Sequence, residues 1–374
     1  MVGIGYMAEV FNLESYLSNG VENIVRGAIK ASLSNPKESI FIAKYAMSSK
    51  NSRKLRVEAE DRGDHIPPFL IASITSQCNL HCKGCYARGN NACVDREAQN
   101  QLTEQEWLRI FNEAKELGIG FILLAGGEPF MRSDIIKEAG KIPEIIFPIF
   151  TNGTMIDDEY IKLFIKHRNL IPILSIEGNE VYTDERRGGG VYQKLIGAMD
   201  IMKTNKILYG TSVTVTKQNL NEVTTIEFLD KLYSRGCKVV FFIEYVPITK
   251  DTEYMAFENE ERDILKEKMV GLRNTYEDMI FISFPGDEKT SGGCLAAGRG
   301  FFHINSHGGA EPCPFSPYSD TNLKNVSLKE AINSPLFKKL RDNNLLIEEH
   351  AGGCVLFERE EQVKQLIADG SVEI

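Results

Sequence analysis

The clearest feature of the chain is a series of short apolar runs separated by longer amphipathic stretches. The runs cover residues 69–75, 121–125, 146–150, 171–175, 209–215 and 239–243. Continuous apolar runs of this length predict strands that are buried on both faces, as in a parallel sheet. The stretches between them, at 104–117, 135–139, 157–167, 192–204 and 223–235, have the apolar spacing of helices. Six strand-then-helix units therefore predict an α/β fold, either a parallel barrel or a doubly wound sheet.

Two flanking segments differ from this central part. Residues 1–66 have helical apolar spacing, with a second helix expected from Pro36 to Met47, and predict a helical segment that packs on the next domain, although a helix lying on a membrane surface is the alternative. Residues 284–374 are rich in glycine and contain three cysteines. Such a loop-rich segment buries little apolar surface, so a metal centre is the natural way to hold it together. We therefore expect three units, at 1–66, 67–283 and 284–374.

Composition and charge exclude several classes of protein. The chain has 374 residues, 43% hydrophobic and 25% charged, which is ordinary for a globular protein. Its formal net charge of −9 argues against general binding to nucleic acid. The first residues lack the basic start of a secretory signal, and no apolar run approaches the ~20 residues that span a bilayer. We therefore expect a cytoplasmic protein without an integral membrane segment.

Three of the eight cysteines lie in one short run directly after the first apolar run. Cys78, Cys82 and Cys85 have the spacing C-x3-C-x2-C. A 4Fe–4S cluster normally takes four cysteine ligands, so three would leave one iron open to a small molecule. A zinc site that includes His81 is an alternative, although His81 directly precedes Cys82 and adjacent residues rarely bind the same ion. A disulfide would need an oxidising compartment, which nothing in the sequence indicates.

The cysteine run resembles that of the radical S-adenosylmethionine (SAM) superfamily. The resemblance implies a 4Fe–4S cluster on Cys78, Cys82 and Cys85, with the amino and carboxylate groups of SAM on the open iron. In that family the reduced cluster gives an electron to the sulfonium, and a 5′-deoxyadenosyl radical results. The resemblance also implies that residues 67–283 form a partial (β/α)6 TIM-like barrel.

Polar motifs at the ends of the later apolar runs are similar to the family's SAM-binding motifs. Glu128 belongs to a GGE sequence whose backbone and carboxylate hold the SAM amino group in the family. Ser175 and Arg187 match residues near the SAM carboxylate, and the register favours Arg187 over its neighbour Arg186. The candidate SAM-binding residues implied by the resemblance are Gly126, Gly127, Glu128, Thr151, Asn152, Ser175, Arg187 and Thr214.

A second group of cysteines, Cys294, Cys313 and Cys354, resembles the C-terminal auxiliary-cluster domains called SPASM and twitch. The complete SPASM pattern has more cysteines, so the resemblance implies one auxiliary 4Fe–4S cluster. Its fourth ligand stays open between the substrate and three side chains, Cys237, His350 and Glu358. A zinc site or three inert cysteines are the alternatives.

The remaining thiols and histidines of interest have simpler interpretations. We expect Cys93 and Cys237 to be plain buried thiols. His303 and His307, which flank a glycine-rich turn, are expected to be structural or to face the substrate rather than to bind metal.

Together these features predict a radical SAM oxidoreductase that modifies a peptide, a tetrapyrrole or a small molecule. The resemblance implies a reducing partner such as ferredoxin or flavodoxin. It does not identify the substrate or the catalytic residues. One alternative is a SAM-dependent radical methyl or thiomethyl transferase, with Cys93 or Cys237 as the extra nucleophile. The other is a non-catalytic iron–sulfur or zinc protein, which would not cleave SAM.

Overall fold

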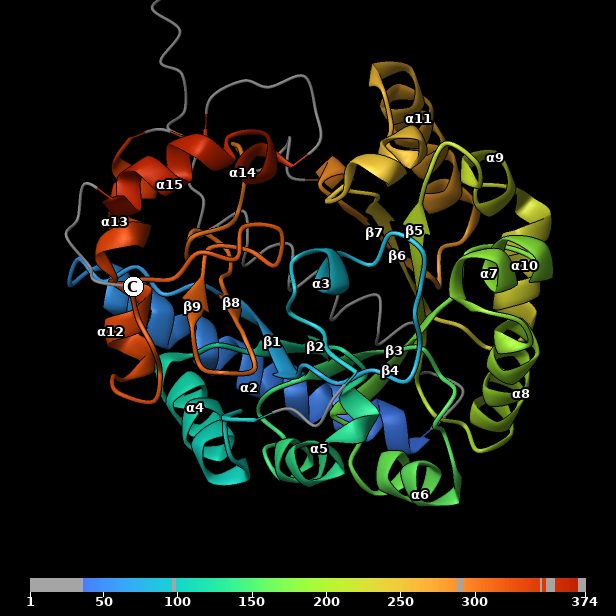
Figure 1. Cartoon of the computed structure of the whole chain (residues 1–374). Helices are drawn as coiled ribbons and strands as arrows, with labels where there is room; N and C mark the ends of the chain where they lie inside the picture. Colours follow the sequence, from blue (N-terminus) through green and yellow to red (C-terminus); the bar gives the residue numbers. More distant parts are fainter. Residues whose placement is uncertain (1–35, 96–98, 288–291, 344, 348–353, 369–374) are drawn as a thin grey trace, which may run out of the picture.

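The computed structural model describes residues 36–95, 99–287, 292–343, 345–347 and 354–368. Its centre is a nine-stranded sheet of order β7-β6-β5-β4-β3-β2-β1-β8-β9, in which only the β8–β9 pair is antiparallel. The strands are β1 (Phe69–Thr75), β2 (Phe121–Gly126), β3 (Phe147–Thr151), β4 (Leu170–Ser175), β5 (Gly210–Val215), β6 (Val239–Glu244), β7 (Ile280–Phe284), β8 (His303–Ile304) and β9 (Ala310–Glu311). Strands β1 to β7 curve around a common interior, with helices on the outside (Figure 1).

The helices fall into three groups along the chain. The helices that connect successive strands are α4 (Glu104–Leu117), α5 (Ser133–Gly140), α6 (Asp158–Lys166), α7 (Glu180–Arg187), α8 (Val191–Thr204), α9 (Leu220–Val223), α10 (Ile226–Ser234) and α11 (Asn259–Thr275). Shorter turns of helix in these connections are α3 (Tyr86–Gly89), η1 (Pro129–Met131) and η2 (Lys250–Met255). The flanking helices are α2 (Pro36–Glu60), α12 (Leu328–Ile332), α13 (Pro335–Asp342), α14 (Val355–Glu358) and α15 (Glu360–Ala368).

The predicted partial barrel is confirmed, with a seventh strand, β7, after the six expected ones. All six predicted strands are present, and α4 has the predicted bounds. Its first turn is a capping box, in which Thr103 accepts a hydrogen bond from the Glu106 N–H and donates its own N–H to the Glu106 carboxylate at 2.7 Å. In the additional strand, β7, Ser283 interrupts the apolar residues, so the sequence shows no continuous apolar run of strand length there. Residues 1–35 of the predicted N-terminal helical segment lie outside the described residues.

The two faces of the sheet differ in how tightly they are packed. Along β2, Ile122 and Leu124 are fully buried against the outer helices, whereas the alternate residues Phe121, Leu123 and Ala125 are only half-buried. Successive side chains of a strand point to opposite faces. The interior of the barrel is therefore more open than its helix-covered outside.

Helix α2 closes the barrel at the end where the strands begin. Tyr45 of α2 is 1% exposed, packs edge-on against Phe121, and donates its hydroxyl to the Gly120 carbonyl at 2.9 Å. It belongs to a cluster with Ile171 and Phe241, near the starts of β4 and β6. The prediction ended this helix near residue 47, because its later polar residues mask the apolar periodicity.

The C-terminal part attaches to the barrel beside its first strand. Strand β8 pairs with β1, with His303 opposite Ile71, and α12 packs against α4 (Figure 1). Lys329 of α12 also forms an ion pair with Asp64 at 2.7 Å. The second cysteine group is thereby brought to the open edge of the barrel.

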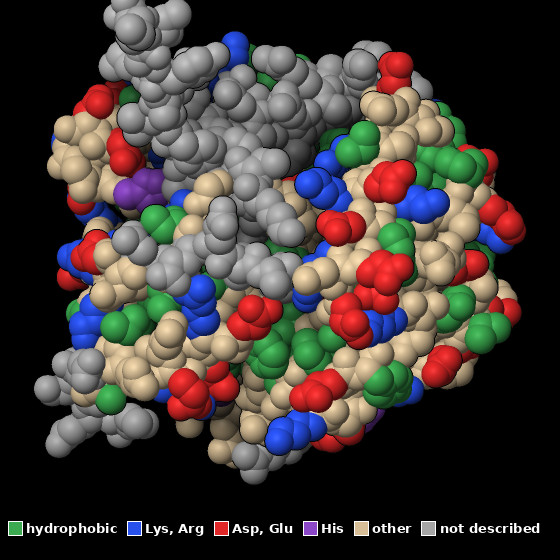
Figure 2. All heavy atoms as spheres, turned by 90° about the horizontal axis from the view of Figure 1, so that it is seen from above, with side chains coloured by type: hydrophobic (Ala, Val, Ile, Leu, Met, Phe, Trp, Pro, Cys, Tyr) green, Lys and Arg blue, Asp and Glu red, His purple; other side chains and the backbone are tan. Residues whose placement is uncertain are grey.

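Acidic and basic side chains are interspersed over the described part of the face shown in Figure 2, so charges of one sign do not dominate it. Within the described ranges, no helix combines the length and the apolar character needed to cross a membrane.

Candidate active site

The first cysteine group lies in the loop that leaves β1, against the turn that leaves β2. The Gly127 N–H donates to the Thr75 carbonyl at 2.8 Å, and the Glu128 N–H donates to the Gln77 carbonyl at 2.7 Å. A Cβ atom at Gly127 would lie 2.0 Å from the Gln77 carbonyl oxygen, so only glycine fits there. The predicted GGE motif therefore sets the position of the loop that carries Cys78, Cys82 and Cys85.

Glu128 is the centre of a buried hydrogen-bond network between β2 and β3. Its carboxylate accepts from the Thr151 hydroxyl at 2.7 Å and from the Asn152 N–H at 2.8 Å. Burial raises the pKa of this carboxyl above its ordinary value, although these hydrogen bonds favour the charged form. The Asn152 side chain also donates to Asn79 in the cysteine loop at 2.8 Å. Sequence-predicted residues from two strand ends are thus joined to the cysteine loop.

Glu177, just after β4, joins a second set of strand ends. It is 1% exposed and forms ion pairs with Arg186 at 2.6 Å and with Arg187, and it accepts from the Thr214 N–H at 3.0 Å. Arg187 also approaches the Cys82 sulfur at 3.9 Å. Burial opposes a charge on Glu177, but the two guanidinium groups outweigh it and hold its pKa below the ordinary value.

Ser175 lies at a strand end as predicted, whereas Arg186 has a role in the site that was not predicted. Ser175 is half-buried at the end of β4, where its Cα pairs with that of Ser212 on β5. Arg186, which the sequence register left outside the site, forms an ion pair with Glu177 as Arg187 does. Sequence reasoning missed the role of Glu177 because only the fold brings both arginines to it.

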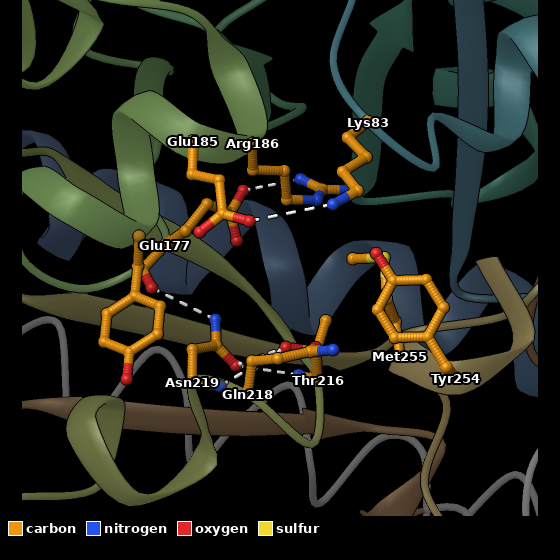
Figure 3. Close-up of a pocket in the computed structure, with 10 residues that line it drawn as sticks. Lys83, Glu177, Glu185, Arg186, Thr216, Gln218, Asn219, Tyr254 and Met255 are labelled. Atoms are coloured by element: carbon orange, nitrogen blue, oxygen red, sulfur yellow. Dashed lines mark hydrogen bonds and ion pairs between the residues drawn. The ribbon is translucent and has the colours of Figure 1, made fainter.

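A cavity of about 200 Å³ opens beside Glu177 and Arg186. Lys83 and Glu185 approach each other at one side of it, and Gln218 lines another side (Figure 3). The Lys83 ammonium lies 5.5 Å from the centre of the Tyr254 ring. Because Lys83 lies between two cysteines of the first group, the cavity adjoins the cysteine loop. Its mixture of charged, amide and aromatic groups suits a small charged ligand with a planar part.

The second cysteine group also comes together. The Cys354 and Cys294 thiols lie close enough to Cys313 to act on its charge, and together with burial they raise the pKa of Cys313 well above its ordinary value. Cys294 and Cys313 are each 7% exposed, and Cys354 is half-buried.

Tyr86 connects the two cysteine groups. It directly follows Cys85, and its ring packs edge-on against Phe315 at 5.2 Å between centroids. Asn90, at the end of α3, donates to the Pro314 carbonyl at 3.2 Å. Burial and the nearby Cys85 and Cys313 thiols raise the pKa of the Tyr86 phenol. The two cysteine groups therefore lie on opposite sides of one aromatic contact.

His303 belongs to a buried polar chain at the β1–β8 junction, which the sequence did not reveal. Its imidazole contacts the Ser73 hydroxyl at 2.7 Å and the Glu311 carboxylate at 2.6 Å, and Asn305 donates to the same carboxylate at 2.6 Å. Ser73, His303 and Glu311 are all less than a tenth exposed. This chain ties the C-terminal part to the barrel wall.

The donor set fits a 4Fe–4S cube, because each group supplies three cysteine thiols and a cube binds each thiolate at a different iron atom. Among the described residues, no three His, Cys, Asp or Glu side chains converge closely enough to hold one metal ion. His350, one candidate fourth ligand, lies outside the described residues, and Cys237 is fully buried beside Thr211.

Comparison with known proteins identifies the family. The model of the radical SAM superfamily matches residues 72–253, which include the first cysteine group and the motifs at the ends of β2 to β5. Residues 72–253 form a radical SAM domain, and the protein is an enzyme. Enzymes of this superfamily use a 4Fe–4S cluster and SAM. The family predicted from the cysteine spacing is confirmed.

Two relatives and one solved structure cover most of the chain. An AdoMet-dependent heme synthase of Methanosarcina barkeri is 26% identical over 318 residues, covering 78% of this chain and 88% of the relative. A PqqA peptide cyclase of Granulibacter bethesdensis is 24% identical over 298 residues, covering 75% and 78%. The structure of Streptococcus suis SuiB bound to S-adenosylmethionine has a TM-score of 0.63 at 20% identity, covering 88% and 80%, which supports the fold.

The Glu177 ion pairs generate a test of stability. Glu177→Gln leaves two buried guanidinium groups without their carboxylate and should lower the free energy of unfolding by roughly 3 kcal/mol at neutral pH. Because the pKa of Glu177 is depressed, its contribution is complete above the ordinary glutamate pKa and is lost as the pH falls through the depressed value. The wild type and Glu177→Gln should therefore differ less in free energy of unfolding at acidic pH than at neutral pH. Urea unfolding at several pH values measures this difference.

The control is Glu227→Gln, which removes an exposed ion pair with Lys231. It should change neither the unfolding midpoint nor its pH dependence. Equal effects of the two substitutions would show that the Glu177 ion pairs do not stabilise the fold.

Proposed function

We propose that the protein is a radical SAM oxidoreductase that modifies a tetrapyrrole with the help of an auxiliary 4Fe–4S cluster. In this proposal residues 67–283 form the SAM-binding core, and 284–374 form the auxiliary-cluster domain. The bound cluster and SAM supply a 5′-deoxyadenosyl radical that removes a hydrogen atom from the substrate. The observation that carries the substrate class is the match over 88% of the length of a heme synthase.

The residues of the chain have distinct tasks in this proposal. Cys78, Cys82 and Cys85 hold the first cluster, and Cys294, Cys313 and Cys354 hold the auxiliary one. Glu128 accepts the SAM ammonium, because a buried carboxylate fixed by its neighbours is poised for a cation. Arg187 pairs with the SAM carboxylate while Glu177 keeps its guanidinium oriented. The backbone of the glycine turn and the strand ends complete the SAM site, through Gly126, Gly127, Thr151, Asn152, Ser175 and Thr214.

The half-open barrel interior supports the placement of substrate between the two cysteine groups. The side chains that point inward along β2 are only partly covered, and the Tyr86–Phe315 contact lies between Cys85 and Cys313. A peptide is the second candidate substrate, favoured by the match to a peptide cyclase over 78% of its length. We propose a ferredoxin or a flavodoxin as the electron donor.

The experiment that tests the function measures SAM cleavage. Reconstituted protein, reduced with dithionite and given SAM, should form 5′-deoxyadenosine and methionine, and iron coproporphyrin III, the tetrapyrrole in the name of a second Methanosarcina barkeri relative, should be converted in parallel. Replacing Cys78, Cys82 and Cys85 by alanine should abolish both reactions. Cleavage of SAM without conversion of the porphyrin would refute the tetrapyrrole but keep the enzyme class. Cleavage by the triple variant would refute the cluster assignment.

Iron content tests the two-cluster proposal. Two cubes imply about eight iron atoms per chain, and removal of either group of three cysteines should leave about four. Elemental analysis of the anaerobically reconstituted protein measures this directly. Roughly one zinc and four iron atoms per chain would instead assign zinc to the C-terminal cysteines.

SAM affinity tests the role of Glu128. Glu128→Gln preserves the size of the side chain but removes the charge facing the SAM ammonium, and such a partner contributes about 1.5–3 kcal/mol. The dissociation constant for SAM should rise roughly ten- to a hundredfold, at about 1.4 kcal/mol per decade. Equilibrium dialysis measures the affinity, and the iron content should stay unchanged because Glu128 does not bind iron. Unchanged affinity would remove Glu128 from the SAM site.

A further inference from the structure

The turn between Cys82 and Cys85 is held by two elements that are remote from it in sequence. Within the turn, the Cys85 N–H donates to the Cys82 carbonyl at 3.2 Å. The first outside contact comes from the end of α7, where the Arg186 carbonyl accepts the Lys83 N–H at 2.8 Å. The connection that follows β4 therefore holds the backbone of the turn directly.

The second outside contact comes from Tyr245, the first residue after β6. Its ring lies so close to Gly84 that a Cβ atom at Gly84 would be 2.3 Å from the phenol oxygen and 2.8 Å from two ring carbons. Tyr245 is 4% exposed, and its N–H donates to the Val215 carbonyl at the end of β5 at 2.9 Å. Because its own surroundings fix this ring, the ring in turn fixes the backbone at Gly84.

The segment after Tyr245 continues along the cysteine loop. Ile248 lies against Gly89, the last residue of α3, where a Cβ atom would be 2.8 Å from the Ile248 Cγ2 atom. Tyr254, in η2, lines the cavity, and its ring centre lies 5.5 Å from the Lys83 ammonium (Figure 3). This segment therefore contacts the loop on both sides of Cys85 and also forms part of the cavity wall.

We propose that Tyr245 is a positioning residue, which fixes the turn between Cys82 and Cys85 and thereby sets where the first cluster lies relative to SAM. This inference rests on the proposed function, in which Glu128 and Arg187 hold SAM from other strands. The rate of SAM cleavage then depends on where the cysteine loop lies relative to those strands.

Two contacts hold the loop at its two ends. The close approach of Gly127 to the Gln77 carbonyl fixes the end near Cys78, and Tyr245 fixes the end near Cys85. A misplacement of about 1 Å at a reacting centre can lower a rate roughly a hundredfold. Loss of the Tyr245 ring should therefore slow SAM cleavage, although Tyr245 is not a proposed ligand of iron or SAM.

The test compares Tyr245→Ala, Tyr245→Phe and the control Tyr276→Ala in the full chain. Tyr276 is 7% exposed and donates its hydroxyl to Asp230 at 2.7 Å, and it lies just before the start of β7, whereas the cysteine loop follows the end of β1. In the cluster-free chain, mass spectrometry follows the alkylation of each cysteine by iodoacetamide. In the reconstituted chain, the rate of SAM cleavage is measured per bound cluster.

Cys82 and Cys85 should be alkylated several-fold faster in Tyr245→Ala than in the wild type, because the turn opens locally. The fully buried Cys237 should stay protected, because the rest of the fold is intact. The reconstituted Tyr245→Ala should cleave SAM roughly a hundredfold more slowly than the wild type. Tyr245→Phe keeps the ring and should restore both values, and Tyr276→Ala should leave both unchanged.

Wild-type alkylation of Cys82 and Cys85 in Tyr245→Ala would overturn the proposal. Equally fast alkylation of Cys237 would also overturn it, because the whole fold and not the turn would then depend on the ring. A Tyr245→Phe variant as slow as Tyr245→Ala would overturn it as well, since the hydroxyl and not the packing of the ring would then matter. A wild-type chain that does not cleave SAM would refute the proposed function, whereas the alkylation rates would still decide whether Tyr245 fixes the turn.

Discussion

The close approach of two strand ends is the constraint on which the site depends. The turn after β2 runs against the loop after β1 so tightly that a side chain at Gly127 would collide with the Gln77 carbonyl. Two backbone hydrogen bonds fix this approach, and the next residue, Glu128, turns inward to organise Thr151 and Asn152. The position of the cysteine loop, the buried carboxylate and the end of β3 therefore follow from one contact between backbones.

Much of this arrangement could be predicted because it follows from local pattern and from parallel geometry. Apolar runs predicted the first six strands, and parallel strands carry their final residues to one edge, which places Glu128 and Arg187 near the cysteines. Strand β7 escaped notice because Ser283 interrupts its apolar character. Helix α2 was predicted too short because its end is held by contacts such as that of Arg56 with the Gly118 carbonyl at 2.7 Å.

The rest of the site depends on contacts between residues that are remote in sequence. The apolar periodicity of the chain does not predict such contacts. Glu177 was not among the predicted site residues, yet it forms ion pairs with two arginines, of which Arg186 lines the cavity and Arg187 approaches Cys82. Cys93 was predicted to be a plain buried thiol, and the Gln77–Val94 bridge places its segment beside the cysteine loop. His303 contacts Ser73 because β8 pairs with β1 at the edge of the sheet, a pairing that the sequence did not predict.

The position of Tyr45 has a consequence for the order of events during turnover. Its side chain packs near the starts of β4 and β6 and bonds to the Gly120 carbonyl, so within the described residues this end of the barrel is covered and the opposite rim is the route for exchange with solvent. As far as the described residues show, SAM and substrate would then enter and leave across this same rim. A molecule seated deeper has to arrive before, and depart after, whatever occupies the rim. A cavity that is closed at one end fixes the order in which ligands bind and leave. It also keeps a reactive species away from water for as long as a ligand covers the rim.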